Sequence, residues 1–337
     1  MNLSEIQSLI KTCTYQGEAM EGHVEETHIS WIIFSNHYVF KIKKPVKLSF
    51  LDFSSLEKRR YFCRRELELN RRFSSIYLEV LPVNNAAGKW IFGQGEGETK
   101  DYAVVMERME SSKRMDKMLT ADRVKEEEMQ ALAKEVAGFH KKAEVIHSPF
   151  DLEKAKSLFQ DIGQISDFVE VSFGPDAKEN LLLSLDWSIL FLEKHADRIG
   201  VRHQKGFVRD LHGDLHGGNI FLYPIPILFD CIEFSDEYRQ IDVLYEIAFL
   251  CMELEVGGHV ELSDFFVKQY LQIIPCFETM EDIALYLYYK CLRASIRAKV
   301  LALGAINCKP IGPTAGDLAR IQQYLDIMNK YMQETNL

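Results

Sequence analysis

Hydrophobic and polar positions follow two different periods along the chain. In roughly the first hundred residues, short apolar or alternating runs predict strands at 29–34, 38–43, 80–83, 89–92 and 102–106. The turn residues at 35–37 join the first two strands into a hairpin. Residues 55–73 are charged, free of Gly and Pro, and helical in spacing, with Ser54 or Ser55 as the N-cap.

Helical periodicity dominates the rest of the chain. It predicts helices at 121–142, 152–164, 178–200, 241–255, 262–274, 281–303 and 316–333, around a short β insert at 220–229. No repeat of 20–50 residues occurs. The order of elements predicts an α+β protein with two lobes: a small β-rich N-lobe with one main helix at 1–106, and a larger helical C-lobe at 107–337.

Composition narrows the choice of partners and compartment. The net charge of −10 and the pI near 5.6 argue against broad nucleic-acid binding, which needs a surplus of Lys and Arg. Neither a signal peptide nor an apolar run of about 18 residues is present, so no membrane span is predicted. Seven cysteines are scattered without a CxxC pair, at positions 13, 63, 231, 251, 276, 291 and 308. We therefore expect a cytoplasmic protein.

The densest candidate chemistry lies in residues 211–234. Asp214 and Asn219 are five residues apart on a glycine-bearing loop, and Asp230 closes the apolar run 225–229. In a kinase catalytic loop, the Asp meets the acceptor proton and the Asn holds a metal. A small number of hard oxygen ligands from the protein is typical of a Mg²⁺ site, because this ion completes its coordination shell with water and nucleotide phosphates. The spacing therefore predicts Asp214 as catalytic base, and Asn219 and Asp230 as metal ligands.

Each of these assignments has an alternative. His212 and His216, four residues apart, fit two core or zinc-binding histidines equally well. Asp214 could cap a loop and Asp230 could end a strand at a turn. Glu233, three residues after Asp230, competes with it as the metal ligand.

A phosphotransferase also needs a cation for the nucleotide phosphates. Lys41 and Lys43 lie two apart on one predicted strand and therefore share a face. Lys41 follows Tyr-Val-Phe as the Lys of a VAIK strand follows its apolar residues, and Glu66 in the next helix is its expected ion-pair partner. Lys43 with Glu57 is the second possibility. The alternative to both is a set of solvated surface charges.

Two further patterns each allow two interpretations. The glycines at 93–97 lie between strands and do not open a helix, which favours a hairpin over a phosphate loop. Lys290, Arg293 and Arg297 form a basic stripe at i, i+3 and i+7 of one predicted helix. Such a stripe either binds an anionic substrate or pairs with acids elsewhere.

The segments 212–219 (HGDLHGGN) and 229–234 (FDCIEF) resemble those of the aminoglycoside phosphotransferase and choline kinase superfamily, a branch of the protein-kinase-like fold. The interval from Asp230 to Asp242 is similar too. The sequence resembles an uncharacterised bacterial aminoglycoside phosphotransferase-like family still more closely, at 26–31, 38–45, 50–53, 56–60, 66–72 and 293–299. In several members of that family a P-loop kinase domain follows.

The resemblance implies a two-lobed kinase-like fold with ATP between the lobes, Asp214 as base, and Asn219 and Asp230 on magnesium. The nucleotide would then contact Lys41, Lys43, Glu66 and the crossing between the lobes at Met106, Glu107 and Met109. Candidates for substrate binding or structural support are His212, Glu233, Asp242, Arg293 and Arg297. The usual glycine-rich loop is absent, and Thr27, His28 and Ser30 stand ahead of Lys41 instead.

The acceptor is expected to be a small molecule. Gly213 replaces the Arg of HRD, and neither DFG nor APE occurs. Only eleven residues separate Asp230 from Asp242, too few for an activation segment that docks a peptide. Two alternatives to a small-molecule kinase are a nucleotide-binding regulatory module (a pseudokinase) and a nucleotidyltransferase acting on proteins, both on the same fold.

Overall fold

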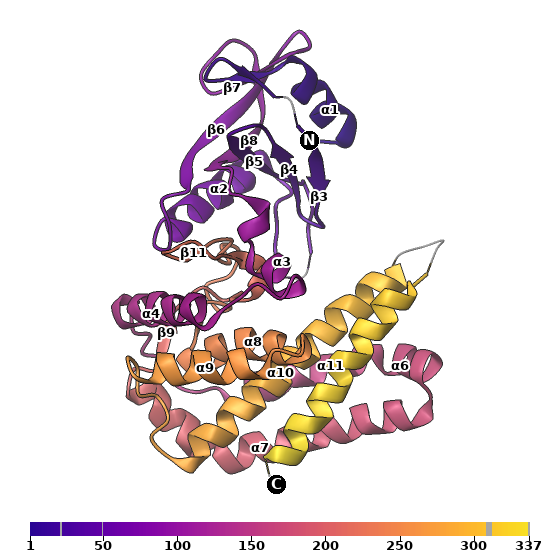
Figure 1. Ribbon diagram of the computed structural model, residues 1–337. Coiled ribbons are helices and arrows are strands. Elements are labelled where there is room, and N and C mark those ends of the chain that lie inside the picture. Colours follow the sequence, from indigo (N-terminus) through magenta and orange to yellow (C-terminus); the bar gives the residue numbers. More distant parts are fainter. Residues whose placement is uncertain (21, 49, 308–311, 336–337) are drawn as a thin grey trace. The chain divides into compact units, whose positions relative to one another are not determined.

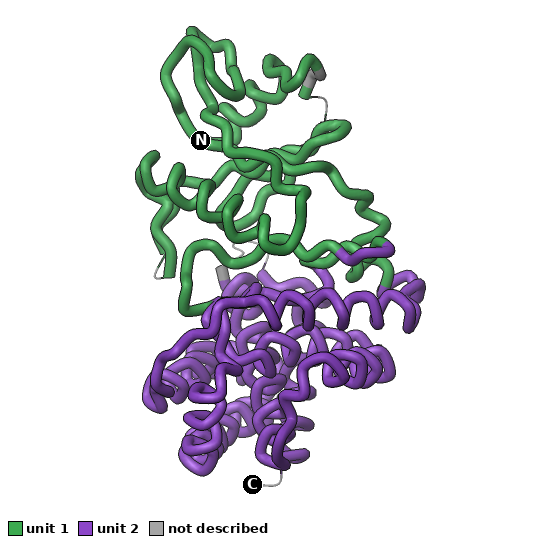
Figure 2. Tube along the Cα trace, turned by 90° about the vertical axis from the view of Figure 1, so that its left-hand side faces the viewer, with its two compact units in different colours: residues 1–118, 219–223, 227–238 green, residues 119–218, 224–226, 239–337 purple. Residues whose placement is uncertain are grey.

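The computed structural model describes residues 1–20, 22–48, 50–307 and 312–335. Contacts divide it into two compact units, coloured separately in Figure 2. Unit 1 comprises residues 1–118, 219–223 and 227–238, and unit 2 comprises 119–218, 224–226 and 239–337. The predicted boundary after residue 106 thus differs from the division by contacts. A backbone hydrogen bond contributes to this difference. The Leu222 N–H donates to the Lys113 carbonyl and so joins the segment after residue 106 to residues 219–223 of the same unit.

Unit 1 is built on an antiparallel sheet with six strands in the described part of the chain, ordered β3-β4-β5-β8-β6-β7 (Figure 1). Their bounds are β3 Val24–Glu26, β4 Ser30–Phe34, β5 Tyr38–Lys43, β6 Tyr77–Ala86, β7 Lys89–Phe92 and β8 Glu98–Glu107. β4 and β5 form the predicted hairpin, in which Ile33 lies opposite Phe40. The sheet therefore places β5, with its two lysines, between β4 and β8.

The prediction of a hairpin at residues 93–97 is wrong. This segment joins β7 to β8, but both strands pair with β6 and not with each other. The physical reason is that a strand has two edges, and β6 uses one for β7 and the other for β8. Periodicity along the sequence identifies strands but not which edge each one occupies.

Two helices pack against the strands of unit 1. α2 (Leu56–Asn70) begins at the predicted N-cap Ser55, whose hydroxyl accepts a hydrogen bond from the Lys58 N–H at 3.3 Å. α1 (Leu3–Thr12) is a helix that the sequence analysis missed. Its start carries a capping box, since the Asn2 side chain accepts from the Glu5 N–H and the Glu5 carboxylate accepts from the Asn2 N–H.

The sheet separates two apolar clusters of unit 1. One contains Phe40 and Ile42 together with residues of α1, and the other contains Val39 and Val104 together with Cys63 of α2. Because side chains of a strand alternate, odd-numbered residues of β5 face α2. The shorter elements of unit 1 are β1 Thr14–Tyr15, β2 Glu18–Ala19, η1 Ser111–Lys113, β10 Ile220–Phe221 and β11 Ile227–Leu228. Two further short elements, α3 Met115–Thr120 and η3 Gly217–Asn219, contain residues of both units.

Unit 2 is mainly helical. Its helices are α4 Glu126–Lys142, α5 Leu152–Gln160, η2 Asp161–Ile165, α6 Ser166–Phe173, α7 Pro175–Gln204, α8 Val243–Val256, α9 Val260–Leu271, α10 Met280–Asn307 and α11 Ala315–Glu334, with strands β9 Val208–Asp210 and β12 Gln240–Asp242. α10 and α11 run side by side (Figure 1) and share an aromatic-rich core with α7. All seven predicted helices are present, and α6 was missed. No described helix is long and apolar enough to cross a membrane.

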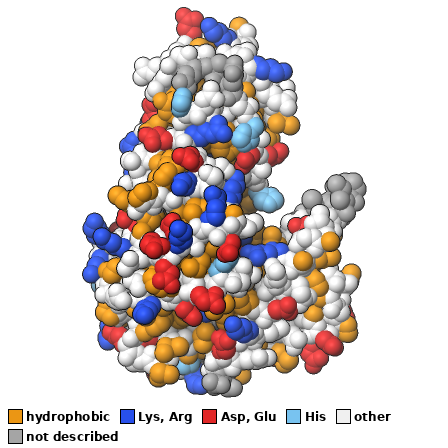
Figure 3. All heavy atoms as spheres, viewed as in Figure 1, with side chains coloured by type: hydrophobic (Ala, Val, Ile, Leu, Met, Phe, Trp, Pro, Cys, Tyr) orange, Lys and Arg blue, Asp and Glu red, His pale blue; other side chains and the backbone are white. Residues whose placement is uncertain are grey.

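Charged side chains of both signs are interspersed with apolar ones on the face shown in Figure 3. The six cysteines within the described residues are buried and form no disulfide, at positions 13, 63, 231, 251, 276 and 291. Cys308, the seventh in the sequence, lies outside the described residues.

Candidate active site

Both lysines of β5 meet one carboxylate on α2. Lys41 and Lys43 project from the face of the sheet that α2 covers, and Glu66 is fully buried beneath them. Lys41 Nζ lies 2.9 Å from Glu66 Oε1, and Lys43 Nζ lies 2.6 Å from Glu66 Oε2. The predicted pair of Lys41 with Glu66 is present, and Lys43 shares the same acid.

The alternative pair of Lys43 with Glu57 is wrong. Glu57 lies in the first turn of α2 and is exposed, whereas Glu66 is more than two turns further along the helix, on the buried side. Burial alone would raise the pKa of Glu66, but the two ammonium groups outweigh it and lower that pKa to about 2. Glu66 is therefore ionised throughout the physiological range.

The same lysines bind two acids that follow β11. Lys41 Nζ lies 2.6 Å from Asp230 Oδ1, and Lys43 Nζ binds the Glu233 carboxylate. The two acids differ in exposure, since 43% of the Asp230 side chain is exposed but only 4% of the Glu233 side chain. Of the two rival metal ligands, Asp230 alone therefore presents a carboxylate that is open to further ligands.

Asn219 and Asp230 lie at the same end of a small hairpin. β10 and β11 pair antiparallel with Ile220 opposite Leu228, and the Phe229 N–H donates to the Asn219 carbonyl at 3.1 Å. The predicted hairpin over residues 220–229 is thus present. Because the two strands are antiparallel, the residue that precedes β10 and the residue after Phe229 meet at one end. In unit 1, a residue with an amide side chain and a residue with a carboxylate side chain therefore lie at the same end of the hairpin.

Asp214, in unit 2, lies in a loop that two histidines frame. Gly213 before it has φ +85°, which a side chain at this position would disfavour. The Asp214 N–H donates to His212 Nδ1 at 3.3 Å, and Asp214 Oδ2 lies 3.4 Å from His216 Nε2. His216 Nδ1 accepts from the Gly218 N–H at 3.1 Å, so a neutral His216 ring carries its proton on Nε2, facing Asp214.

The charge of Asp214 is stabilised from two sides. Burial raises its pKa, but His216, His212 and the Arg293 guanidinium outweigh burial and hold the pKa below the usual carboxyl range. Arg293 also donates to the carbonyl of Gly213 at 3.0 Å and lies over the ring of Tyr245. Asp214 is therefore a carboxylate at neutral pH and can accept a hydrogen bond from a hydroxyl.

The rest of the basic stripe on α10 pairs with acids of α8. Lys290 Nζ lies 2.9 Å from Glu255 Oε1, and Arg297 Nε lies 3.0 Å from Glu253 Oε1. Of the two possibilities that the sequence left open, the structure places these two side chains in ion pairs within unit 2. Arg293 differs from them, because it binds the loop that carries Asp214.

Asp242 takes a supporting position. It caps α8 through the Leu244 N–H at 2.8 Å and accepts two hydrogen bonds from the fully buried Arg202.

Met106 and Glu107 are the last two residues of β8, and Met109 packs against the apolar cluster that contains Val39 and Val104. Contact of these last three residues with a nucleotide stays a prediction.

Comparison with known proteins adds the fold. No family model matches the sequence. Uncharacterised proteins of Mycobacterium tuberculosis and Mycobacterium bovis are 29% identical to the chain over 320 residues, which cover 93% of this chain and 60% of each relative. The chain thus spans about 60% of the length of these curated relatives.

Solved structures match along nearly the whole chain. Choline kinase from Cryptosporidium parvum superposes with a TM-score of 0.57 at 12% identity, covering 98% of this chain and 97% of that one. A choline/ethanolamine kinase family protein from Mesorhizobium loti gives 0.50 at 12% identity over 98% and 100%. Ethanolamine kinase from Plasmodium vivax gives 0.50 at 11% identity over 96% and 84%. The fold is protein-kinase-like.

The α+β kinase-like fold expected from the sequence is therefore confirmed. One residue that supports the loop carrying Asp214 was missed. Glu246 on α8 is fully buried, and its carboxylate accepts from the N–H groups of His212 at 2.7 Å and Gly213 at 3.0 Å. It anchors the two peptide groups just before Asp214. The signal in the sequence is a lone acid four residues after Asp242, within an otherwise apolar stretch of helix.

Glu246 should make the stability of the protein depend on pH. Burial raises its pKa from 4.5 to about 7, against the two backbone hydrogen bonds that lower it. The folded state therefore binds a proton that the unfolded state releases between these values, and stability falls as the pH rises through them. We expect the wild type to lose of the order of 3 kcal/mol more unfolding free energy than Glu246→Gln across this interval.

Denaturant unfolding at pH 4.5 and at pH 7 measures the effect, with the pH limits taken from the two pKa values of Glu246. Glu261→Gln, at an exposed position of α9, is the matched control and should show the same change in unfolding free energy between the two pH values as the wild type. An equal change in unfolding free energy for the wild type and Glu246→Gln would contradict the raised pKa of Glu246.

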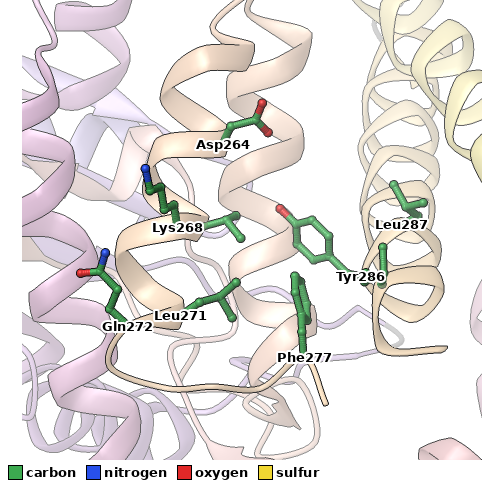
Figure 4. Close-up of a pocket in the computed structure, with 9 residues that line it drawn as sticks. Asp264, Lys268, Leu271, Gln272, Phe277, Tyr286 and Leu287 are labelled. Carbon is green, nitrogen blue, oxygen red and sulfur yellow. The ribbon is translucent and has the colours of Figure 1, made fainter. Parts of the chain in front are cut away.

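A separate cavity of about 610 Å³ opens between α9 and α10 in unit 2. Figure 4 shows Tyr286 and Phe277 beside Leu271, with Asp264 and Lys268 on α9 and Gln272 directly after it. None of the predicted site residues lines it. Its walls are mostly apolar, and it offers no cluster of groups suited to phosphoryl transfer.

Proposed function

We propose that the protein is a magnesium-dependent phosphotransferase that moves the γ-phosphate of ATP to a hydroxyl of a small-molecule acceptor. The observation that carries the proposal is the meeting of Asn219 and Asp230 at one end of the β10–β11 hairpin, with Lys41 bound to Asp230, in a protein-kinase-like fold. An amide, a carboxylate and an ammonium are the groups that kinases direct at magnesium and nucleotide phosphates.

The donor set at the hairpin end fits magnesium. Among residues 1–20, 22–48, 50–307 and 312–335, no group of three or more His, Cys, Asp or Glu is placed to hold a metal ion. Asn219 and Asp230 supply two hard oxygen ligands, as expected for an ion that keeps several waters and takes phosphate oxygens. Bound magnesium would neutralise charge on the β- and γ-phosphates.

Lys41 is the better candidate for the nucleotide phosphates. Its Nζ contacts the partly exposed Asp230, whereas the Lys43 side chain is fully buried between Glu66 and Glu233. Burial opposes the charge of Lys41, but Asp230 and Glu66 outweigh it and raise the pKa of Lys41 well above its usual value. Lys41 therefore keeps its positive charge and can bind the negatively charged nucleotide phosphates. Met106 and Glu107 at the end of β8, and Met109 shortly after it, are assigned to the base of the nucleotide.

Asp214 is assigned to the acceptor hydroxyl. In the reaction, the acceptor oxygen forms a bond to the γ-phosphorus, the bond from that phosphorus to the bridging oxygen of ADP breaks, and the hydroxyl proton passes to Asp214. Phosphoryl transfer of this kind depends mainly on positioning. Two contacts support such a role: the Asp214 N–H donates to His212, and the Asp214 carboxylate lies beside His216.

The described cysteines form no disulfide, which favours the cytoplasm as the compartment.

The proposal is tested by measuring ADP release from Mg·ATP in the presence of a pooled bacterial metabolite extract, for the wild type and Asp214→Asn. ADP that is formed only by the wild type, and only with extract, supports a small-molecule kinase and lets the acceptor be fractionated. Pyrophosphate in place of ADP would indicate nucleotidyl transfer. Nucleotide binding without either product would favour a regulatory module.

Loss of the Lys41 ammonium should impair the use of ATP. We expect Lys41→Met to lower kcat/KM for ATP by about 10²-fold, the usual effect of removing one preorganised charge-stabilising donor. Steady-state kinetics with the fractionated acceptor measure it. Lys44→Met is the matched control, since Lys44 pairs with Glu26 and stacks on Trp31 outside the Glu66 cluster. A wild-type kcat/KM for ATP in Lys41→Met would contradict the assignment.

A further inference from the structure

Two side chains hold the backbone of the turn that carries Asp230. The Asp230 N–H donates to the hydroxyl oxygen of Tyr77 on β6 at 3.0 Å. The next N–H, of Cys231, donates to Asn70 Oδ1 at the end of α2 at 2.8 Å. Tyr77 and Asn70 are both buried. Successive peptide groups of the turn are thus bound by side chains from two separate elements.

A third anchor is ionic. Glu233, three residues after Asp230, binds Lys43 of β5, which also binds Glu66. These three charged side chains are almost fully excluded from solvent. Removal of one partner would leave an uncompensated buried charge, so the pair resists local opening. The sheet and α2 therefore hold this segment at Asp230, Cys231 and Glu233.

The anchored turn has an unfavourable backbone conformation. Asp230 has φ +62°, in the left-handed region that a residue with a side chain rarely adopts. Such a conformation costs of the order of 1 kcal/mol and persists where surrounding contacts over-determine it, as often occurs at functional sites. The contacts of Tyr77, Asn70 and Lys43 supply that over-determination.

We propose that Tyr77, Asn70 and the Lys43–Glu233 pair are positioning residues that hold the Asp230 carboxylate at the hairpin end beside Asn219. Lys43 thereby has a different task from Lys41, although the two lie on one face of β5. The proposal rests on the proposed function, because it assumes that Asp230 is a magnesium ligand. Groups that orient a metal ligand through hydrogen bonds usually account for 10- to 100-fold in metal affinity.

The test measures Mn²⁺ binding to the full chain in the presence of ADP, with free Mn²⁺ followed by electron paramagnetic resonance. We expect Tyr77→Phe and Glu233→Gln to bind Mn²⁺ about 10- to 100-fold more weakly than the wild type, the usual effect of losing a group that orients a metal ligand. Tyr331→Phe is the matched control, since it removes a buried hydroxyl that binds Glu255 at 2.6 Å in unit 2. It should lose stability but keep wild-type affinity. Tyr77→Phe carries the test if Glu233→Gln does not fold.

Asp230→Ala separates the two possible failures. Wild-type binding that Asp230→Ala abolishes, with unchanged affinity in Tyr77→Phe, overturns the positioning role and leaves the proposed function standing. A wild type that binds no Mn²⁺ with ADP, or that binds it as Asp230→Ala does, overturns the metal site and this inference with it. Weakened binding in Tyr77→Phe but not in Tyr331→Phe supports the role, because a general loss of stability would affect both.

Discussion

Asp214→Asn should lower kcat for phosphoryl transfer by about 10²- to 10⁴-fold, the usual contribution of a positioned general base. The amide keeps the size of the side chain and can still accept from His216 Nε2, which lies 3.4 Å from Asp214 Oδ2 in the wild type. It has no carboxylate to take the acceptor proton. Nucleotide affinity should change little, because Asp214 is assigned to the acceptor and not to the phosphates.

Single-turnover kinetics with saturating Mg·ATP measure the chemical step directly, and a fluorescent nucleotide measures binding. His216→Asn is an informative companion, because it removes the group that lowers the pKa of Asp214 most strongly. The acid limb of its pH–rate profile should move to higher pH than in the wild type. Wild-type rates in Asp214→Asn would refute the assignment of the base, even if nucleotide binding persists.

Arg202→Met should destabilise the protein by about 3–5 kcal/mol, the usual cost of leaving buried charges unpaired. Arg202 is fully buried and donates to both oxygens of Asp242, at 2.7 and 2.8 Å. It also donates to Asp282 at 2.8 Å and to the carbonyl of Cys276 at 2.8 Å. Methionine fills much of the volume but satisfies neither acid.

Equilibrium unfolding in urea measures this loss, provided that the transition is cooperative. Arg320→Met is the control, because the Arg320 side chain is 37% exposed and pairs with Glu253 at 3.0 Å. A pair of this kind contributes about 0–1 kcal/mol. A similar small loss for both variants would show that the Arg202 cluster is not a stabilising centre of unit 2.

Local sequence patterns were enough to predict most elements. The helices of unit 2, the β4–β5 hairpin and the β10–β11 hairpin each depend on neighbours within about twenty residues, where periodicity and turn residues act directly. Lys41 and Glu66 were predictable as partners because a strand period and a helix face both restrict which side chains can meet. α1 was missed although its capping box at Asn2 and Glu5 is visible in the sequence.

Only the tertiary structure decided which buried charges meet. Lys41 binds Asp230 and Lys43 binds Glu233 across separations of 189 and 190 residues, and no local pattern specifies such a pairing. The same holds for the strand order around β6 and for Glu246 beneath the loop of Asp214. A buried charge must find a partner, but which partner depends on the packing of whole elements. The sequence by itself determined most of the elements and the candidate catalytic groups. The packing of the sheet, α2 and the segment after β11 decided how three acids share two lysines.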